Sequence, residues 1–599
     1  MSDPADRNGR CGDLIVMFNG ERPGLTRESR TPWVLEERME TWALWREDAG
    51  PGWKGFPIRR IAAGGWQLWL LGELFGLPKD GDLEAEILAV ADGRKPAASL
   101  NGHFILLGWN GGSGEWHVVT DRFGTIHAYL ARDGRRAAIG TFSPAVADGA
   151  SRRQVDWAGL TGFFSFGFFP EDRTFFEDVR IVRPGMRKVL DASGRPLREE
   201  RTWTWRHEPD GRRSYDETVG EFGEVLGEIL GEHAAGRRLA VPISGGLDSR
   251  TTVAALTGGD AASDPENLWA YSYGYSEDSV ETRIARRVAA ARKIPFEALT
   301  IGPYLFERLD EILACIEGFQ DITQCRQAVV IPSLAERTDR VVAAHWGDVW
   351  LDDTGLVGSG ISGPETVVAH SLKKIRKSGG TWLTRNVCAG HLGDGRDVEA
   401  LLEGFVRREL DRLPAIEDPD FRVKAFKTEQ WSFRWTLASL RMFQAGAFPR
   451  LPFYDNRMAD FFSTVPSKFT AGRRLQIDYL KRHAPDLARI TWQARGASLY
   501  RATRPDVLLL PERALKKLFR LATGRHVVER NWEVQFLSPS GRAGLERWLL
   551  APGLKLHDLV SRTEVVGLLA DFFRAPFEAG RGYTVSMLLT FSAWLERYG

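Results

Sequence analysis

Residues 238–250 read Arg-Leu-Ala-Val-Pro-Ile-Ser-Gly-Gly-Leu-Asp-Ser-Arg, and this stretch decides the fold of the larger part of the chain. Its first six residues form a short apolar run of the kind that a buried strand shows. A Gly-rich turn follows, and the apolar residues from Val253 to Leu256 continue as a helix. The order of strand, turn and helix indicates one βα unit of a parallel sheet.

The same alternation extends to both sides of this unit. Upstream, Ser214 and Glu217 have capping-box spacing, which predicts the start of a helix. Its apolar residues recur at helical spacing: Val219, Phe222, Leu226, Ile229 and Leu230. Downstream we expect a strand at 268–273, a helix at 279–291 and a strand at 341–344. The pattern predicts a doubly wound parallel sheet, followed by a mostly helical part from about residue 400 onward.

Residues 13–145 have a different pattern. Short runs rich in Trp, Val, Ile and Phe alternate with Gly-rich stretches at 64–72 and 108–114, which indicates turns between antiparallel strands. A polar segment, RHEPDGRR at 206–213, separates the two patterns. We therefore predict three parts of an α/β and α+β protein. They are a β-rich domain at 1–205, an α/β domain at 206–500, and a helical C-terminal extension at 501–599 packed on the second domain.

The composition is that of an ordinary globular protein, with 43% apolar residues, 27% charged residues and a formal net charge of +1. This charge gives no sign of a nucleic-acid or membrane partner. The four cysteines, at positions 11, 315, 325 and 388, have neither zinc-site spacing nor the density of a disulfide scaffold. Because no apolar run is long enough for a membrane span and no signal pattern is found, we expect a cytoplasmic protein, and we leave a homodimer open.

The turn at 244–250 has the chemistry of an anion site. Where a buried strand leads into a helix, backbone N–H groups and the helix N-terminus can face one anion, here pyrophosphate. The two glycines let a ligand approach the backbone, and Ser244 and Ser249 add hydroxyl donors. Asp248 can hold a magnesium ion that bridges phosphate oxygens. No Gly-Lys-Ser/Thr follows, so this is not a Walker loop, and the alternative is a turn that binds nothing.

These residues resemble the pyrophosphatase loop of enzymes that cleave ATP between the α and β phosphates, and among them most closely the asparagine synthetase family. Tyr271-Ser-Tyr-Gly274 looks like that family's adenine-contacting turn, and Gly347-Asp348 looks like its second metal-binding aspartate. Arg450-Leu-Pro-Phe-Tyr-Asp455 is similar to its Arg-x-Pro-Phe-Leu-Asp segment. The resemblance covers most of residues 214–495 and implies an ATP pyrophosphatase domain of the adenine nucleotide alpha hydrolase-like fold.

The resemblance implies ATP and Mg2+ as cofactors, with Asp248 and Asp348 as the metal ligands. The residues implied to bind ATP or pyrophosphate are Ile243, Ser244, Gly245, Gly246, Leu247, Asp248, Ser249, Tyr273, Gly274, His345 and Gly347.

Two further pairs of residues are assigned by the resemblance. Arg473 and Arg474 stand where the family has a cationic Gly-Lys segment and are implied to be catalytic, although guanidinium is planar where ammonium is compact. The alternative is that both are solvated helix-face residues. Arg450 and Asp455 are implied to belong to a substrate pocket, and the alternative for Asp455 is a structural role in capping or bridging loops.

Several neighbours of the motifs have plainer interpretations. Asp348 can be an ordinary turn residue, and Asp352 and Asp353 are expected to be solvated. His345 replaces the family's functional glutamate, which argues against aspartate as the substrate, and we expect it to be a packed or turn residue rather than a base. Trp431 and Trp435, at helical spacing, are expected in the core.

Residues 100–129, through LNGHFILLGW and DRFGTIHAY, resemble the glutamine-hydrolysing domain of asparagine synthetase, a class II glutamine amidotransferase. The implied fold is the αββα sandwich of Ntn-hydrolases. Its chemistry needs a cysteine at the mature N-terminus, which Cys11 provides only if ten residues are removed. In Leu71-Gly72-Glu73 a leucine replaces the oxyanion-hole asparagine, and losing one such donor typically costs about 3 kcal/mol. We therefore expect a degenerate glutaminase, kept as a structural partner.

The resemblance implies an ATP-dependent amide-forming ligase, which adenylates a carboxylate and transfers ammonia or an amine to it. The substrate is expected to be a small-molecule or peptide carboxylate, such as an acidic sugar of surface-polysaccharide assembly. Two alternatives stay open. One is an intramolecular cyclase of the β-lactam synthetase or lasso-peptide cyclase type, in which the substrate supplies its own amine. The other is a nucleotide-binding pseudoenzyme without turnover.

Overall fold

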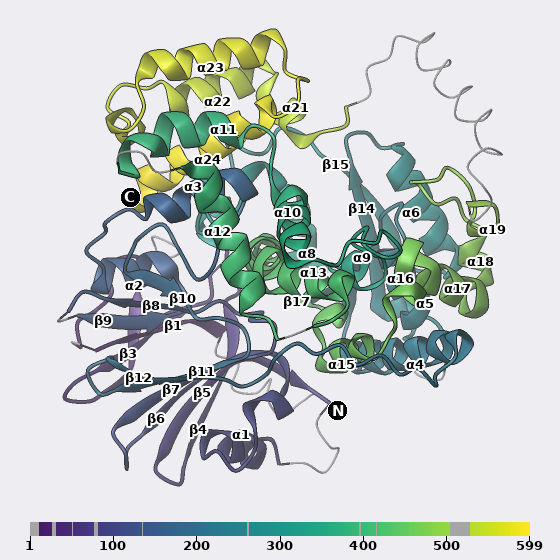
Figure 1. The fold of residues 1–599 in the computed structure, drawn as a ribbon, viewed down its shortest axis with the longest axis horizontal. Helices are drawn as coiled ribbons and strands as arrows, with labels where there is room; N and C mark the ends of the chain where they lie inside the picture. Colours follow the sequence, from purple (N-terminus) through teal and green to yellow (C-terminus); the bar gives the residue numbers. More distant parts are fainter. Residues whose placement is uncertain are drawn as a thin grey trace.

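Two β-sheets, one antiparallel and one parallel, organise the computed structural model (Figure 1), which describes residues 11–599 apart from 19, 27–31, 51, 77–81, 135, 260–262, 394–396, 415 and 503–527. The antiparallel sheet precedes residue 206 and the parallel sheet follows it. This mixed α/β architecture is the one that the sequence predicts.

The antiparallel sheet has twelve strands and bends into two layers. One layer contains β1 (Cys11–Met17), β2 (Trp33–Arg38), β3 (Ala43–Asp48), β8 (Tyr129–Arg132), β9 (Ala137–Gly140) and β10 (Val179–Ile181). The other contains β4 (Phe56–Ala63), β5 (Trp66–Phe75), β6 (Asn101–Asn110), β7 (Glu115–Thr120), β11 (Met186–Asp191) and β12 (Pro196–Arg201). The layers join where Cys11 and Gly12 of β1 pair with β4.

Helices cover both outer faces of these layers. The helix α1 (Leu83–Ala91) packs on the β4–β7 layer through Ile87 and Val90, which contact a cluster of strand residues that includes Leu68 and Leu106. On the opposite side, α2 (Ser143–Ala150) packs on β8 and β9 (Figure 1). The alternate strand residues point inward and form the main core, in which Trp116 is fully buried. The order is therefore helix, sheet, sheet, helix.

The parallel sheet contains five strands in the order β15-β14-β13-β16-β17. Their bounds are β13 (Leu239–Pro242), β14 (Leu268–Gly274), β15 (Phe296–Thr300), β16 (Arg340–Val342) and β17 (Phe448–Arg450). Along the chain this order is 3-2-1-4-5, so the sheet is doubly wound, as predicted. The direction of strand addition reverses between β13 and β16, and ligands of such sheets bind outside the carboxyl ends of the strands at this point.

Helices connect and surround these strands. The helix α4 (Tyr215–Ala234) begins with the predicted capping box of Ser214 and Glu217, and α5 (Asp248–Leu256) and α6 (Val280–Ala291) follow β13 and β14. The other helices are α3 (Trp157–Phe166), α7 (Leu309–Ile316), α8 (Ile331–Arg337), α9 (Gly347–Trp350), α10 (Pro364–Ile375), α11 (Gly380–Leu383), α12 (Val398–Asp411), α13 (Pro419–Lys427), α14 (Leu437–Leu440), α15 (Asn456–Ser463), α16 (Ser467–Thr470), α17 (Arg474–His483), α18 (Pro485–Ala488) and α19 (Leu499–Ala502). Two stretches, η6 (Thr384–Cys388) and η8 (Thr428–Thr436), are π-helical.

The turn predictions of the first domain need correction. Within 64–72 the chain turns at Gly64 and Gly65 alone, and Gly72 lies inside β5 with φ = +105°; within 108–114 it turns at 111–114, as predicted. A side chain at Gly72 would collide with the carbonyl oxygen of His103 on β6, so this glycine serves a close approach of two strands. Gly108 likewise lies inside β6. The sequence cannot distinguish a glycine that the backbone conformation requires from one that neighbouring atoms require.

The described part of the predicted C-terminal extension, residues 528–599, is helical: α21 (Asn531–Phe536), α22 (Pro539–Leu549), α23 (Arg562–Arg574) and α24 (Arg581–Tyr598). Residues 503–527 of that extension lie outside the described ranges. Contrary to expectation, α24 packs on both parts of the chain and not on the second alone. Trp594 stacks on Phe175 at 3.8 Å, and Thr590 Oγ1 accepts a hydrogen bond from Ile322 N. Figure 1 shows these helices beside α3 and α11.

A buried ion cluster joins the two sheets. Glu73 of β5 pairs with Arg340 of β16 at 2.8 Å and with Arg450 of β17 at 3.1 Å. Burial alone would raise the pKa of Glu73, but the two guanidinium groups outweigh it and lower the pKa to about 2. The carboxylate is therefore charged at every physiological pH.

Among the helices within the described ranges, none combines the length and the apolar character needed to cross a membrane.

Candidate active site

A cavity of about 440 Å3 lies at the carboxyl ends of β13, β14 and β16, where the strand order reverses. Six residues predicted to bind nucleotide line it: Ile243, Ser244, Asp248, Ser249, Tyr273 and His345. The second predicted metal ligand, Asp348, lines it as well. The structure thus brings together side chains that stand about 100 positions apart in the sequence.

The loop between β13 and α5 places the side chains of Ser244 and Ser249 at this cavity and is held by its own hydrogen bonds. Ser244 N–H donates to Ser249 Oγ at 3.0 Å, Gly246 N–H donates to Ser244 Oγ at 3.2 Å, and the two hydroxyl oxygens lie 3.2 Å apart. No side chain caps the N-terminus of the nine-residue helix α5, whose N-cap residue is Leu247. The first N–H groups of this helix are therefore available to an anion, which the helix dipole also favours.

Four other residues predicted to contact the nucleotide pack against neighbouring side chains and do not line the cavity. Gly245 packs against the side chain of Gln493, and a Cβ there would collide with it. Leu247 is fully buried in the core. Gly274 packs against Ser279 at the start of α6, and a Cβ on Gly347 would lie 2.9 Å from the ring of Phe453. These residues are not part of the cavity lining, so their role here is close packing.

Asp248 and Asp348 line the same cavity. Burial raises the pKa of Asp248 to about 6; Arg473 opposes this rise, and the carboxylate of Asp348 adds to it. Asp248 Oδ1 accepts hydrogen bonds from Arg473 Nη1 at 3.1 Å and from Gln476 Nε2 at 3.0 Å. The other oxygen, Oδ2, takes part in neither bond, and Asp348 is exposed.

These two carboxylates could hold a divalent cation such as magnesium. Within the described ranges, no group of three or more His, Cys, Asp or Glu side chains could hold a metal, so the protein offers the two carboxylates alone. Magnesium is usually bound by one or two carboxylates together with waters and substrate phosphates. The uncapped N-terminus of α5 next to these carboxylates is suited to such a phosphate group.

Of the two arginines predicted to be catalytic, only Arg473 reaches the site. Besides its bond to Asp248, Arg473 Nε lies 3.4 Å from Asp352, and Gly472 N–H donates to Asp353 at 3.1 Å. Asp352 and Asp353 are thus not merely solvated; they hold the segment that presents Arg473. The exposed Arg474 lies instead over the ring of Tyr215, at 3.9 Å, outside the cavity.

His345 is neutral at physiological pH. Burial lowers its pKa to about 4, against the opposing carboxylate of Asp348. Its Nδ1 has no hydrogen-bond partner among the described residues. The side chain lines the cavity, where it offers a neutral polar group.

Several cavity residues were missed or misread from the sequence. Trp431 and Trp435, predicted to be core, line the cavity from the π-helical segment η8, together with Lys427 at the end of α13. Helical spacing marks one face of a helix but does not say whether that face meets a core or a cavity. Arg326 also lines the cavity and lies over Tyr273 at 5.9 Å, and no motif signals it.

Arg450 and Asp455 lie elsewhere. Arg450 belongs to the ion cluster with Glu73 and donates to the carbonyl of His233. Asp455 is fully buried, caps α15 through Arg457 N–H, and accepts a hydrogen bond from Asn101 of the first sheet at 3.0 Å. Neither lines the cavity, so the structure places them at the junction of the two sheets and not in a substrate pocket. The structural alternative describes Asp455 correctly.

The predicted glutaminase residues lie at one end of the first sheet. Cys11 is half-buried and begins β1, opposite Pro57 of β4, and β4 pairs with β5 next to Leu71 and Gly72. Two strand spacings, roughly 10 Å, therefore separate Cys11 from Gly72. Leu71 is fully buried in the core between the layers, and its side chain offers no donor.

Residues 80–203 match a family described as a glutamine amidotransferase domain. The matched range begins after Cys11 and after Leu71-Gly72-Glu73 and ends before the parallel sheet. No curated protein matches the chain.

Two solved structures are among those similar to the chain. The allosteric regulatory enzyme of purine biosynthesis is 13% identical, with a TM-score of 0.21, over 48% of this chain and 75% of that one. Glutamine phosphoribosylpyrophosphate amidotransferase from B. subtilis, in complex with ADP and GMP, is 14% identical, with a TM-score of 0.19, over 50% of this chain and 62% of that one. The family match supports the amidotransferase-like domain predicted for the first part of the chain: residues 80–203 are similar to a glutamine amidotransferase domain.

Proposed function

We propose that the chain is an ATP-dependent amide-forming ligase of the asparagine synthetase kind, which adenylates a carboxylate and passes the acyl group to ammonia or an amine. The observation that carries this proposal is the uncapped N-terminus of α5, flanked by Ser244 and Ser249, in a cavity that also holds Asp248 and Asp348. The glutamine amidotransferase match of residues 80–203 is in keeping with amide-transfer chemistry.

In this scheme the loop and the start of α5 hold the terminal phosphates of ATP, and Tyr273 lies on the side of the adenosine. Asp248 and Asp348 would hold magnesium, which would neutralise charge on the phosphates. A carboxylate oxygen of the substrate attacks the α-phosphorus, and the bond to the bridging oxygen breaks, so that its electron pair leaves with pyrophosphate. The amine nitrogen then attacks the acyl carbon, AMP leaves, and the nitrogen loses a proton. The protein contributes position and charge.

The exchange of labelled pyrophosphate into ATP, measured across a panel of carboxylic acids, tests this function. A ligase of this kind gives exchange that depends on the acid and on magnesium. Tight ATP binding without exchange for any acid would instead identify a nucleotide-binding protein without turnover.

Arg473 is expected to influence the pH at which the activity falls on the acid side of the pH profile. Because the guanidinium lowers the pKa of Asp248, replacing Arg473 with Gln should raise that pKa further, so that the carboxylate is protonated up to a higher pH. In a pH profile of kcat/KM for MgATP, the acid limb should move above its wild-type position near pH 6. Arg474→Gln, which changes an exposed neighbour outside the cavity, is the control and should leave the limb in place. An unchanged limb in Arg473→Gln would contradict this role.

We further propose that the first domain does not hydrolyse glutamine. Leu71 offers no oxyanion donor, and the family match begins after Cys11. Cys11→Ala should therefore leave the ammonia-dependent reaction unchanged, and wild-type protein should release no glutamate from glutamine above background. Glutamate release by protein processed to begin at Cys11, absent in the alanine variant, would refute the proposal.

A further inference from the structure

Part of the cavity lining is unlike the phosphate-binding loop. Trp346, Lys427, Trp431 and Trp435 form it, and we call these four residues the tryptophan wall. Lys427 Nζ lies 5.7 Å from the ring centroid of Trp346 and 5.2 Å from that of Trp431. The wall therefore offers large apolar faces to the cavity, and Lys427 adds an ammonium group to this part of the lining.

Asp348 connects this wall to the phosphate-binding side. It lines the same cavity as Asp248 and Ser249 on one side and as Lys427 and Trp431 on the other. If the loop holds the terminal phosphates and Tyr273 the adenosine side, the acid that attacks the α-phosphorus approaches from the tryptophan wall.

Lys427 has no anionic partner of its own. In the part of the chain that the structure describes, its ammonium group forms no hydrogen bond or ion pair, although it is half-buried. Lys424, one turn earlier on α13, is paired with Asp420 at 3.2 Å and bonded to Thr470 at 3.1 Å. Since a desolvated charge without a partner is unfavourable, an anionic ligand at Lys427 would relieve that cost.

We propose that the tryptophan wall is the binding site of the carboxylic acid, that Lys427 holds the reacting carboxylate, and that the acid carries an aromatic or extended apolar body. This inference rests on the proposed function and specifies its substrate class. Planar rings that stack on indole gain about 0.5–1.5 kcal/mol beyond the apolar area that they bury. Aspartate would leave these faces unused and would bring its own ammonium group close to that of Lys427.

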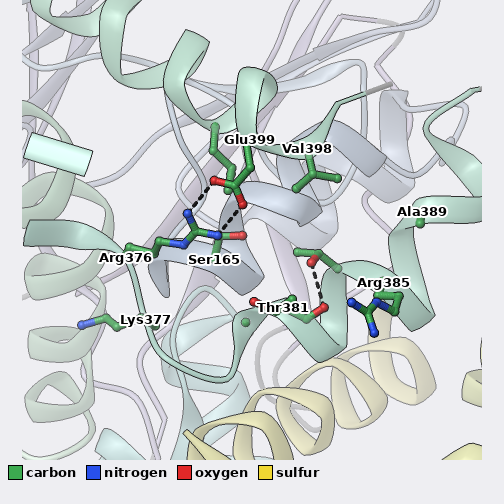
Figure 2. A pocket seen from close by; sticks show the side chains of 11 residues that line it. Ser165, Arg376, Lys377, Thr381, Arg385, Ala389, Val398 and Glu399 are labelled. Atoms are coloured by element: carbon green, nitrogen blue, oxygen red, sulfur yellow. Dashed lines mark hydrogen bonds and ion pairs between the residues drawn. The ribbon is translucent and has the colours of Figure 1, made fainter. Parts of the chain in front are cut away.

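A second cavity provides a matched control. It measures about 230 Å3 and is lined by residues of α11, η6 and α12 together with Ser165 and Lys377 (Figure 2). Figure 2 shows Lys377 extending away from the Arg376–Glu399 ion pair and from Arg385. Its Nζ lies 4.7 Å from the centroid of Trp431, but Lys377 does not line the first cavity. Lys377 therefore shares the tryptophan contact of Lys427 without its access to the proposed acid.

The test measures pyrophosphate exchange with benzoate, cinnamate and hexanoate against acetate and aspartate, in wild type and in Lys427→Gln, Lys427→Arg, Trp431→Ala, Trp431→Phe and Lys377→Gln. Lys427→Gln should raise the KM for the acid at least about tenfold, the range expected for a charged hydrogen bond, with the KM for ATP unchanged. Lys427→Arg should restore part of the affinity. Trp431→Ala should weaken cinnamate more than acetate, and Trp431→Phe should retain most of the preference. Lys377→Gln should change neither KM.

Quenching of tryptophan fluorescence by the acids alone, without ATP, gives a readout that does not depend on turnover. Quenching and exchange that favour the aromatic acids, both lost in Lys427→Gln, would support the inference. Exchange confined to aspartate or acetate would overturn the inference and leave the proposed function standing. Absence of exchange with every acid, while cinnamate still quenches through Lys427, would overturn the proposed function and leave the acid site in place. Equal effects of Lys377→Gln and Lys427→Gln would overturn the role of Lys427.

Discussion

Asp248→Asn is expected to reduce pyrophosphate exchange by at least about a hundredfold and, at the same time, to stabilise the protein. The loss of activity follows because an amide cannot replace a carboxylate that holds magnesium on the phosphates, and removing one such electrostatic group typically costs about a hundred- to a thousandfold. The amide oxygen can still accept the bonds from Arg473 and Gln476, so the local geometry should persist.

The gain in stability follows from the pKa of Asp248. Because the folded protein raises it from 3.8 to about 6, the folded state binds the proton more tightly than the unfolded state does. The resulting penalty is absent below pH 3.8 and fully present above pH 6, where it amounts to about 1–3 kcal/mol. The unfolding temperature of Asp248→Asn should therefore exceed that of wild type at pH 7.5 and approach it at pH 4.

The control for this prediction is Asp460→Asn, which changes an exposed carboxylate that is paired with Arg122 and does not line the cavity. It should keep both activity and the unfolding profile. An Asp248→Asn variant with wild-type exchange would leave the proposed mechanism without its metal ligand.

Glu73→Gln is expected to destabilise the protein by about 3–5 kcal/mol, the usual cost of removing one partner from a buried ion pair. Arg340 and Arg450 are only 6% and 7% exposed, so both guanidinium groups lose the carboxylate that offsets their burial. Denaturant midpoints at pH 7 give the size of the effect. Glu73 does not line the cavity, so the folded fraction of the variant should keep its affinity for ATP.

The effect of Glu73→Gln should depend on pH in a defined direction. The folded pKa of Glu73 lies at about 2, below the ordinary value of 4.5. The stabilising contribution of its charge is therefore complete above pH 4.5 and is lost as the pH falls toward 2. Wild type and variant should differ most at pH 7 and converge only as the pH falls to about 2. Glu365→Gln, at an exposed pair with Arg407, should not move the midpoint. A constant difference at all pH values would show that the charge is not responsible.

Much of the second sheet could be predicted because its signals are local. The run before Ser244, the turn and the helix that follows are adjacent in the chain, and the capping box at Ser214 needs only Glu217 three residues on. The strands β15 and β17 were not predicted. Their sequences, FEALT and FPR, have no clear alternation, and β17 depends on pairing with β16, more than 100 residues earlier.

The rest of the site could not be predicted because it depends on tertiary packing. Lys427 and the π-helical turns that carry Trp431 and Trp435 come from a segment with no motif, and only the fold brings them to the loop. Glu73 shows the opposite case. The resemblance assigned it to a glutaminase site, but the structure pairs it with two arginines from the other sheet. The sequence Leu71-Gly72-Glu73 does not indicate a partner more than 260 positions away.

The position of α24 bears on how the chain folds as it is synthesised. Phe591 and Trp594 cover the aromatic rings of Phe164 and Phe175, which belong to the first third of the chain. During translation these rings therefore emerge from the ribosome uncovered, and they stay so until more than 400 further residues have been translated. During that interval an exposed aromatic surface invites chaperones or self-association, so we expect the two sheets to reach their final packing together after translation, rather than one after the other.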